Sequence, residues 1–145
     1  MPFHKVAVAI ITPTHTKKSF ELGLEMAKKF DSELTVIECM YKTPPKFYFF
    51  ETKSDKKLIQ NQTTKLKKEL ENWKGIAQKQ GVPIKTKLAL TENISHWVID
   101  YVKENNIDLL IVDYPKLSLE EITLFDDIIN EIHHKSHCHL LTTKS

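Results

Sequence analysis

The sequence predicts an α/β protein with an open, mostly parallel five-stranded sheet, helices on both faces, and one domain spanning residues 1–145. Short apolar runs of strand length alternate with stretches that have the apolar periodicity of helices. Two of the runs, 6–11 and 107–112, are almost wholly apolar, which is typical of strands buried on both faces. Strict alternation of strand and helix implies right-handed crossovers and a parallel sheet between helical layers. A chain of 145 residues can bury a core without a disulfide or metal.

The first part of the chain supplies two strands and two helices. Strand 6–11 is followed by a turn at 12–16 and by a helical pattern, whose apolar stripe is Phe20, Leu24, Ala27 and Phe30. Residues 34–40 predict the second strand. An irregular stretch over 41–53 precedes a long lysine-rich helix, whose apolar stripe is Leu66, Leu70, Trp73 and Ala77. Gly81 lies where a glycine commonly ends a helix.

The second part supplies three strands and two helices. Residues 84–88 alternate apolar with polar side chains, which is typical of an edge strand with one wet face. The next helix has the spacing of one apolar side, formed by Ile94, Trp97, Val98, Tyr101 and Val102. After strand 107–112, Ser118 and Glu121 predict a capping box. It opens a helix with the apolar stripe Ile122, Phe125, Ile128, Ile129 and Ile132, and a short strand over 138–141 ends the chain.

The composition argues against most ways of holding phosphate. The chain has 3 glycines, and its 21 basic residues are all lysine. A glycine-rich loop and a bidentate guanidinium are therefore both unexpected. Residues 1–90 carry 17 lysines against 9 acidic residues, whereas residues 91–145 carry 4 against 10. This asymmetry can mark a polyanion-binding face, but a solvated outer helix face explains it as well, so nucleic acid is an unexpected partner.

Cysteine usage and hydropathy indicate a cytoplasmic protein. Cys39 and Cys138 lie far apart and form no CxxC motif, so we expect two reduced thiols. The apolar run at 6–11 is too short for a signal peptide or a membrane span. We expect no membrane association.

Several stretches resemble the universal stress protein family. Residues 5–30 are similar to its first strand, loop and helix, and 33–36 to its second strand. Residues 106–112 resemble the family's GADLIVMG strand, and 134–141 its RHAPCPVLVV tail. The resemblance implies the strand order 3-2-1-4-5 and a homodimer that pairs through the C-terminal strand. It also implies a stress-response or regulatory function, which we expect to act through an unknown protein partner.

The sequence departs from the family at the nucleotide site. Nucleotide-binding members carry an Asp at the end of the first strand, where this chain has Ile11. They also carry G-x-x-G, nine residues and then G-[ST], and the matching positions are Asp113, Lys116, Asp126 and Asp127. Carboxylates there would repel a triphosphate. The resemblance therefore points to the subgroup that does not bind ATP, with no cofactor expected; ATP or AMP binding by a degenerate motif is the third-ranked alternative.

In an open α/β sheet, ligands bind where the strand order reverses, outside the carboxyl ends of the strands. The candidate residues of this crevice are Thr12, Thr14, His15, Asp113, Tyr114, Lys116, Asp126 and Asp127. His15 and Asp113 could form an acid–base pair, or His15 could front a helix and Asp113 end a strand. Because no nucleophile or metal motif accompanies them, we expect no enzyme activity.

The alternative to a partner-binding protein is a sensor that binds a small ligand in the crevice or a transition metal at the C-terminal histidines. Imidazole suits zinc, nickel or copper, and the candidate ligands are His133, His137 and His139. In a strand His137 and His139 would share a face, and two copies could converge in a dimer. A polar strand end with a buried Cys138 is the interpretation that we favour over a metal site. The aromatic run 47–50 could seal the empty pocket, dock a partner or simply pack under its loop.

Overall fold

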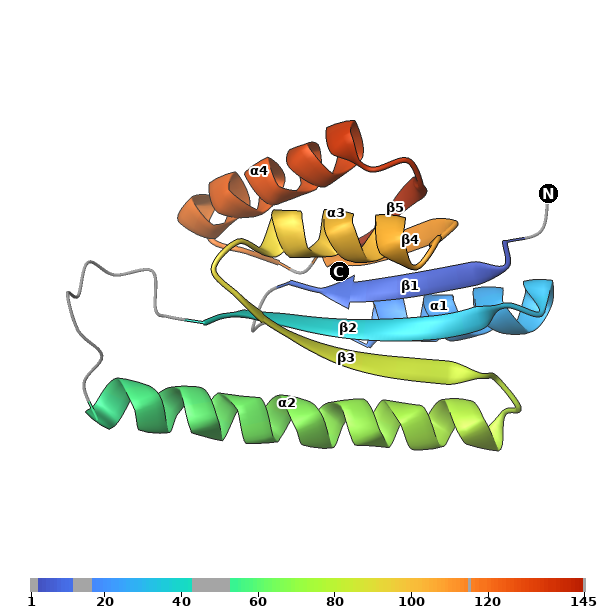
Figure 1. Ribbon diagram of the computed structural model, residues 1–145, viewed down its shortest axis with the longest axis horizontal. Helices are drawn as coiled ribbons and strands as arrows, with labels where there is room; N and C mark the ends of the chain where they lie inside the picture. The colour runs from blue at the N-terminus through green and yellow to red at the C-terminus, as the bar shows by residue number, and fades with distance from the viewer. Residues whose placement is uncertain (1–2, 12–16, 43–52, 115, 145) are drawn as a thin grey trace.

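The computed structural model describes residues 3–11, 17–42, 53–114 and 116–144. Within them, strands and helices alternate along the chain as the sequence predicts (Figure 1). The order is β1 (Lys5–Ile10), α1 (Lys18–Phe30), β2 (Glu33–Tyr41), α2 (Lys53–Lys79), β3 (Ile84–Thr91), α3 (Ile94–Glu104), β4 (Leu109–Tyr114), α4 (Leu119–Lys135) and β5 (His139–Lys144). The aromatic run 47–50 lies outside the described residues.

The five strands form one parallel sheet in the order β3-β2-β1-β4-β5, which confirms the predicted fold class. At its centre, Val8 of β1 pairs with Val36 of β2 on one side and with Ile111 of β4 on the other. The strand order therefore reverses next to β1, between β1 and β4. As predicted, β3 is an edge strand.

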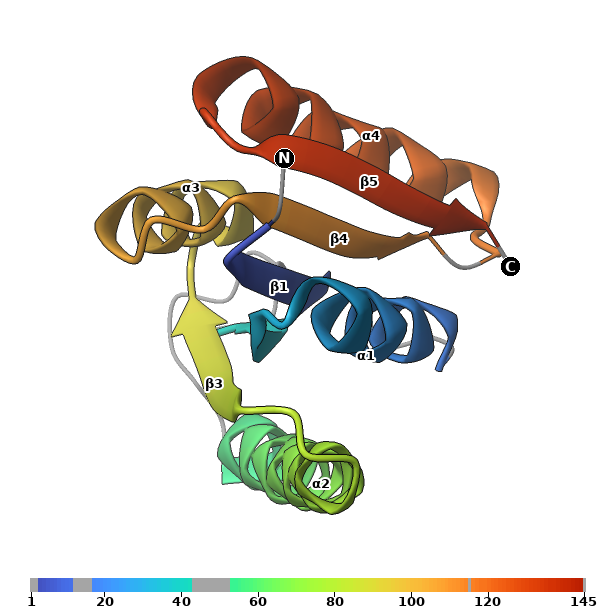
Figure 2. The same ribbon diagram turned by 90° about the vertical axis from the view of Figure 1, so that its right-hand side faces the viewer.

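Two apolar cores lie on the two faces of the sheet. Helices α1 and α2 cover the face that carries Val8, Leu34 and Val36, and α3 and α4 cover the opposite face (Figure 2). The first core includes Trp73 of α2, which is 2% exposed and stacks on Phe20 of α1 with 5.0 Å between ring centroids. This stacking joins the two helices of that layer.

Two strands begin later than the sequence predicts. β4 starts at Leu109 rather than 107 because the Asp108 carboxylate accepts the backbone N–H groups of His4 (2.9 Å) and Lys5 (2.8 Å). β5 covers residues 139–144 rather than 138–141, since the backbone N–H of Cys138 bonds to Ser136 Oγ (3.3 Å) in a turn. The Asp108 carboxylate thus ties the start of β1 to the start of β4.

Both predicted helix-end signals are present. The Gly81 N–H bonds to the Gln78 carbonyl and the Val82 N–H to the Ala77 carbonyl, with a Gly81 φ of 75°. This is the Schellman arrangement, and its positive φ is why a glycine ends α2. At α4, Ser118 and Glu121 form the predicted capping box. None of the helices in the described residues is both long enough and apolar enough to cross a membrane.

Candidate functional site

The carboxyl ends of β1 and β4 form the switch point of the sheet, where the sequence places a ligand crevice. Of its candidate residues, Thr12, Thr14 and His15 lie outside the described residues. The structure places the others on two elements: Asp113 and Tyr114 end β4, whereas Asp126 and Asp127 belong to α4. Lys116 is exposed between them. The pairing of His15 with Asp113 therefore stays a prediction.

Asp113 is an internal residue of the sheet rather than an open ligand position. It is 2% exposed, and its Oδ1 accepts a hydrogen bond from Thr143 Oγ1 (3.3 Å). The two residues face each other because Asp113 of β4 is in register with Thr143 of β5. A carboxylate buried in this way is stabilised only by its polar neighbours, so the hydroxyl of Thr143 helps to keep it in place.

Tyr114 connects the end of β4 to α4. Its hydroxyl donates to Asp126 Oδ1 (2.7 Å), and its ring meets the Phe125 ring edge-on, with centroids 4.5 Å apart. The hydrogen bond to Asp126 raises the pKa of the Tyr114 hydroxyl above its ordinary value. Tyr114 and Asp126 are thus hydrogen-bonded to each other near the carboxyl end of β4.

Asp126 and Asp127 lie within α4 and not at its start. α4 begins at Leu119, so both residues come after its first four positions. From the fifth position on, each backbone N–H donates to a carbonyl group of the same helix. These N–H groups are therefore not available to a phosphate. The predicted capping box at Ser118 and Glu121 already places the start of this helix before the two aspartates, and the structure confirms it.

The true start of α4 is already satisfied by its own side chains. Ser118 Oγ accepts the Glu121 N–H (3.3 Å), and Glu121 Oε1 accepts the Ser118 N–H (3.1 Å). The hydrogen bond from the Ser118 backbone lowers the pKa of Glu121. With Glu120 also in the first turn, two carboxylates lie where a helix would otherwise attract an anion.

The C-terminal histidines do not converge within one chain. His133 and His134 end α4 with their rings 5.2 Å apart, and the His139 ring meets Phe3 edge-on at 5.9 Å. His137 lies in the turn before β5, so the expectation that it shares a strand face with His139 is wrong. In the described residues, no three His, Cys, Asp or Glu side chains are grouped as metal ligands. A metal site made by two copies stays a prediction.

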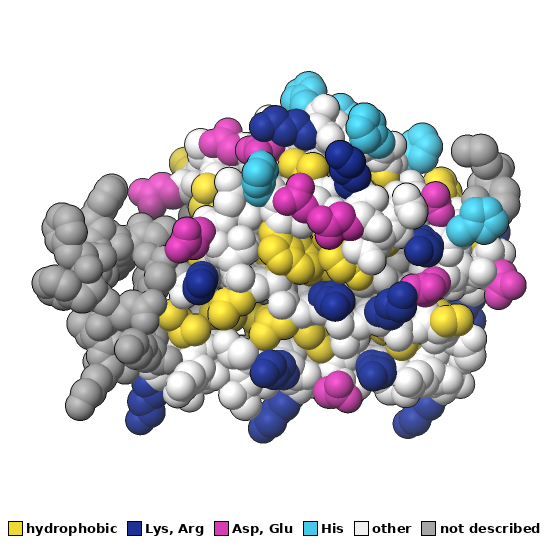
Figure 3. Space-filling model, in the orientation of Figure 1, with side chains coloured by type: hydrophobic (Ala, Val, Ile, Leu, Met, Phe, Trp, Pro, Cys, Tyr) yellow, Lys and Arg dark blue, Asp and Glu magenta, His cyan; other side chains and the backbone are white. Residues whose placement is uncertain are grey.

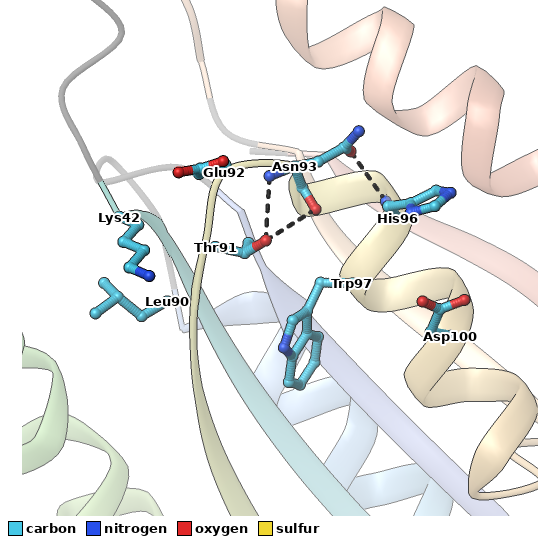
Figure 4. Close-up of a pocket in the computed structure, with 8 residues that line it drawn as sticks. All are labelled: Lys42, Leu90, Thr91, Glu92, Asn93, His96, Trp97 and Asp100. Carbon is cyan, nitrogen blue, oxygen red and sulfur yellow. Dashed lines mark hydrogen bonds between the residues drawn. The ribbon is translucent and has the colours of Figure 1, made fainter. Parts of the chain in front are cut away.

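A shallow pocket of about 420 Å³ lies where β3 leads into α3 (Figure 4). Its lining residues are Lys42, Leu90, Thr91, Glu92, Asn93, His96, Trp97 and Asp100. Asn93 Oδ1 accepts the His96 N–H (3.1 Å), so the start of α3 is capped from within. The lining includes one cation, Lys42, and two acids, Glu92 and Asp100. The pocket therefore presents no single charge that selects a class of ligand.

The surface charge follows the asymmetry of the sequence. Figure 3 shows lysines gathered over β3 and α2, while histidines gather along α4 at the opposite edge. The N-terminal, lysine-rich part of the chain forms β1, β2, β3 and their helices, so the strand order separates the two charge types in space. The lysines of α2 are mostly exposed, as expected for an outer helix face.

Two carboxyl groups that the sequence did not single out meet beside the sheet. Glu38 of β2 is 0% exposed, and the carboxyl group of Glu69 on α2 influences its ionisation. Burial, together with the Glu69 carboxylate, raises the pKa of Glu38 from 4.5 to about 9. A single glutamate inside the apolar run 34–40 was the available signal, but its partner is far away in the chain.

The parallel sheet in the order β3-β2-β1-β4-β5, with helices on both faces, defines a Rossmann-like α/β protein. The chain belongs to the universal stress protein family, whose model matches residues 2–144. No curated protein matches it significantly.

Solved structures of the family share the fold at low sequence identity. Universal stress protein UspA from Lactobacillus plantarum superposes with a TM-score of 0.78 at 12% identity, covering 98% of each chain. A family member from Burkholderia pseudomallei gives 0.75 at 12%, covering 99% of this chain and 97% of that one. The Archaeoglobus fulgidus protein in complex with dAMP gives 0.64 at 12%, covering 98% of each. At this identity the likeness establishes the fold alone.

Proposed function

We propose that this protein is a dimeric universal stress protein that does not bind nucleotides and acts as a regulator through contacts with other proteins, not as an enzyme. One observation carries the proposal. The positions that match the glycine motif are a buried Asp113, an exposed Lys116 and two aspartates inside α4. Dinucleotide and phosphate sites need backbone N–H groups on loops that approach the ligand closely, and α4 has used those groups within itself.

Electrostatics supports the same conclusion. Asp113 lies near the end of β4, and Glu120 and Glu121 lie in the first turn of α4. A triphosphate placed there would meet like charges in a partly desolvated site, and such contacts cost several kcal/mol. The Archaeoglobus fulgidus relative, solved in complex with dAMP, supplies the comparison, since we expect this chain to reject that nucleotide.

Thermal unfolding with nucleotide tests this proposal. We expect ATP, AMP and dAMP, each with Mg²⁺ at millimolar concentration, to leave the melting temperature of this protein unchanged. A family member of known nucleotide binding serves as the positive control in the same assay. A rise of several degrees with any of the three would contradict the proposal, because a ligand that binds the native state stabilises it.

The dimer is proposed to form through β5. In the described part of the chain, β5 is the outer strand beyond β4, so one side of its backbone has no strand partner there. Leu141 is 37% exposed on this strand. A second copy pairing along the same edge would cover this backbone and the leucine.

Hydrodynamic sizing tests the dimer. We expect the protein to have a dimer mass at low micromolar concentration and Leu141→Lys to have a monomer mass, because two lysines would face each other across a two-fold axis. The control is Leu124→Lys on the exposed side of α4, where the leucine is 51% exposed; it should stay dimeric. A monomeric wild type, or monomers in both variants, would exclude pairing through β5.

A further inference from the structure

The sheet ends in two outer strands, β5 and β3, and the proposed dimer covers only β5. β3 is 8 residues long and pairs with β2 without interruption from Ile84 to Thr91. Edge strands are usually short, bulged or interrupted by proline, because a regular edge is ready to pair with another chain. β3 has none of these protections, and in the described part of the chain no strand lies on its outer side.

The backbone groups on the outer side of β3 belong to its even-numbered residues. The carbonyl groups of Pro83 and Thr91 accept N–H groups from β2 and from the residue that follows it, both at 2.9 Å. Backbone groups point to alternate sides along a strand, so the odd-numbered residues bond to β2. Thr86 and Leu88 therefore direct their N–H and C=O groups away from β2, toward the open edge.

Two lysines follow this edge. Lys85 and Lys87 lie two positions apart, so they share the sheet face on which Ala89 is buried in the core under α3. The Lys85 side chain is 60% exposed and forms an ion pair with Glu33 (3.0 Å), and Lys87 is also exposed. β3 itself carries no acidic residue. Figure 3 shows lysines and apolar side chains along the surface between α3 and α2, where β3 runs.

The charge of this edge selects the kind of strand that can be added. Two copies of this chain paired through β3 would bring their lysines together on one face, and like charges on facing strands are destabilising. A strand with acidic residues at alternate positions would instead form opposite-charge pairs with Lys85 and Lys87. The lysines thus act against self-association and in favour of an acidic partner. Nucleic acid would match the charge but could not extend the backbone ladder.

We propose that the edge of β3 binds an extended acidic segment of a partner protein, which adds a strand to the sheet. The backbone of this segment bonds to the outward groups of Thr86 and Leu88, while its acidic side chains lie over Lys85 and Lys87. In this mode of recognition the backbone bonds provide affinity, and the alternate side chains provide specificity. The inference rests on the proposed function, because it names the surface through which this protein would contact another protein.

Fluorescence anisotropy with a labelled peptide tests the proposal. The probe has the 8-residue length of β3 and alternates glutamate with threonine. Lys85→Gln/Lys87→Gln should weaken its binding about tenfold, because two opposite-charge pairs are lost. The matched control is Lys67→Gln/Lys68→Gln, which removes two exposed lysines from α2 and should bind the probe as the wild type does. A peptide of the same composition with its glutamates grouped at one end should bind more weakly than the probe.

Amide hydrogen exchange shows whether the peptide adds as a strand. In the free protein we expect the outward N–H groups of Thr86 and Leu88 to exchange faster than that of Lys87, which points toward β2. Saturation with the alternating peptide should slow exchange at Thr86 and Leu88. The proposal is overturned if this peptide does not bind, if both double variants lose binding equally, or if exchange at Thr86 and Leu88 stays unchanged. None of these results bears on nucleotide rejection or on the dimer, which melting and sizing measure separately.

Discussion

Glu38→Gln is expected to raise the free energy of unfolding at pH 8 by about 2–4 kcal/mol, while leaving it almost unchanged near pH 4.5. The amide fills the same volume as the carboxyl group and can still donate a hydrogen bond to Glu69. It carries no proton that must be released, so the variant avoids the cost of keeping an acid neutral at neutral pH. The gain is therefore largest where the wild-type protein is least stable.

The sign follows from proton binding. Glu38 has a pKa of about 9 in the folded chain against an ordinary value of 4.5. Between these values the native state holds a proton that the unfolded state has released, so stability falls as the pH rises. The slope for one such group is at most about 1.4 kcal/mol per pH unit. Above pH 9 both states have lost the proton and the slope disappears.

Urea unfolding at several pH values from 4.5 to 9 measures this effect. Wild-type stability should fall across the range, and the difference between Glu38→Gln and wild type should widen in step. Glu71→Gln is the matched control, since Glu71 is exposed on the same helix, and it should follow the wild type. Parallel curves for wild type and Glu38→Gln would mean that Glu38 titrates normally.

Gly23→Ala is expected to lower the free energy of unfolding by about 1–3 kcal/mol, although alanine favours helix. Gly23 of α1 lies directly on the sheet. A Cβ there would be 2.5 Å from Val8 Cγ2 and 3.3 Å from Leu34 Cδ1. The branched Val8 side chain is buried at the centre of the sheet and has little room to move, so the helix would have to lift.

Gly75→Ala on α2 is the matched control. No atom lies within 4 Å of the position that its Cβ would take, so the substitution should instead stabilise the protein by about 0.5–1 kcal/mol. Chemical unfolding of both variants at one pH makes the comparison. If Gly23→Ala were also stabilising, α1 would not pack as closely on β1 as the structure has it.

A double substitution separates the steric cause from others. Val8→Ala is destabilising by itself because it leaves a cavity, but it removes the methyl group that Gly23→Ala would strike. The double variant should therefore be more stable than the sum of the two single effects predicts. Simple additivity would point to a cause of the Gly23 effect other than contact with Val8.

The order and type of every strand and helix in the described residues could be predicted from local sequence. Apolar runs such as 6–11 and the helical stripe around Trp73 depend only on side-chain periodicity. Gly81 and the Ser118–Glu121 box end and begin helices through neighbouring residues, so their signals are also local. The strand order came from the resemblance to a family.

The boundaries were harder to predict, because distant residues decide them. Asp108 is the clearest case. Its carboxylate accepts N–H groups of His4 and Lys5, about a hundred positions earlier in the chain, and this delays the start of β4 to Leu109. The start of β5 has a local cause instead: the Cys138 N–H bonds to Ser136 Oγ, and the strand begins only at His139, which leaves His137 outside it.

The sequence by itself determined the α/β class and the order of strands and helices, since both follow from residue type and spacing. Only the tertiary structure showed that Tyr114 is hydrogen-bonded to Asp126 and that Asp113 is buried against Thr143. Only the tertiary structure also brought Glu38 against Glu69. The physical reason is the same in each case, because the free energy of a buried polar group depends on partners that the chain brings near only when it folds.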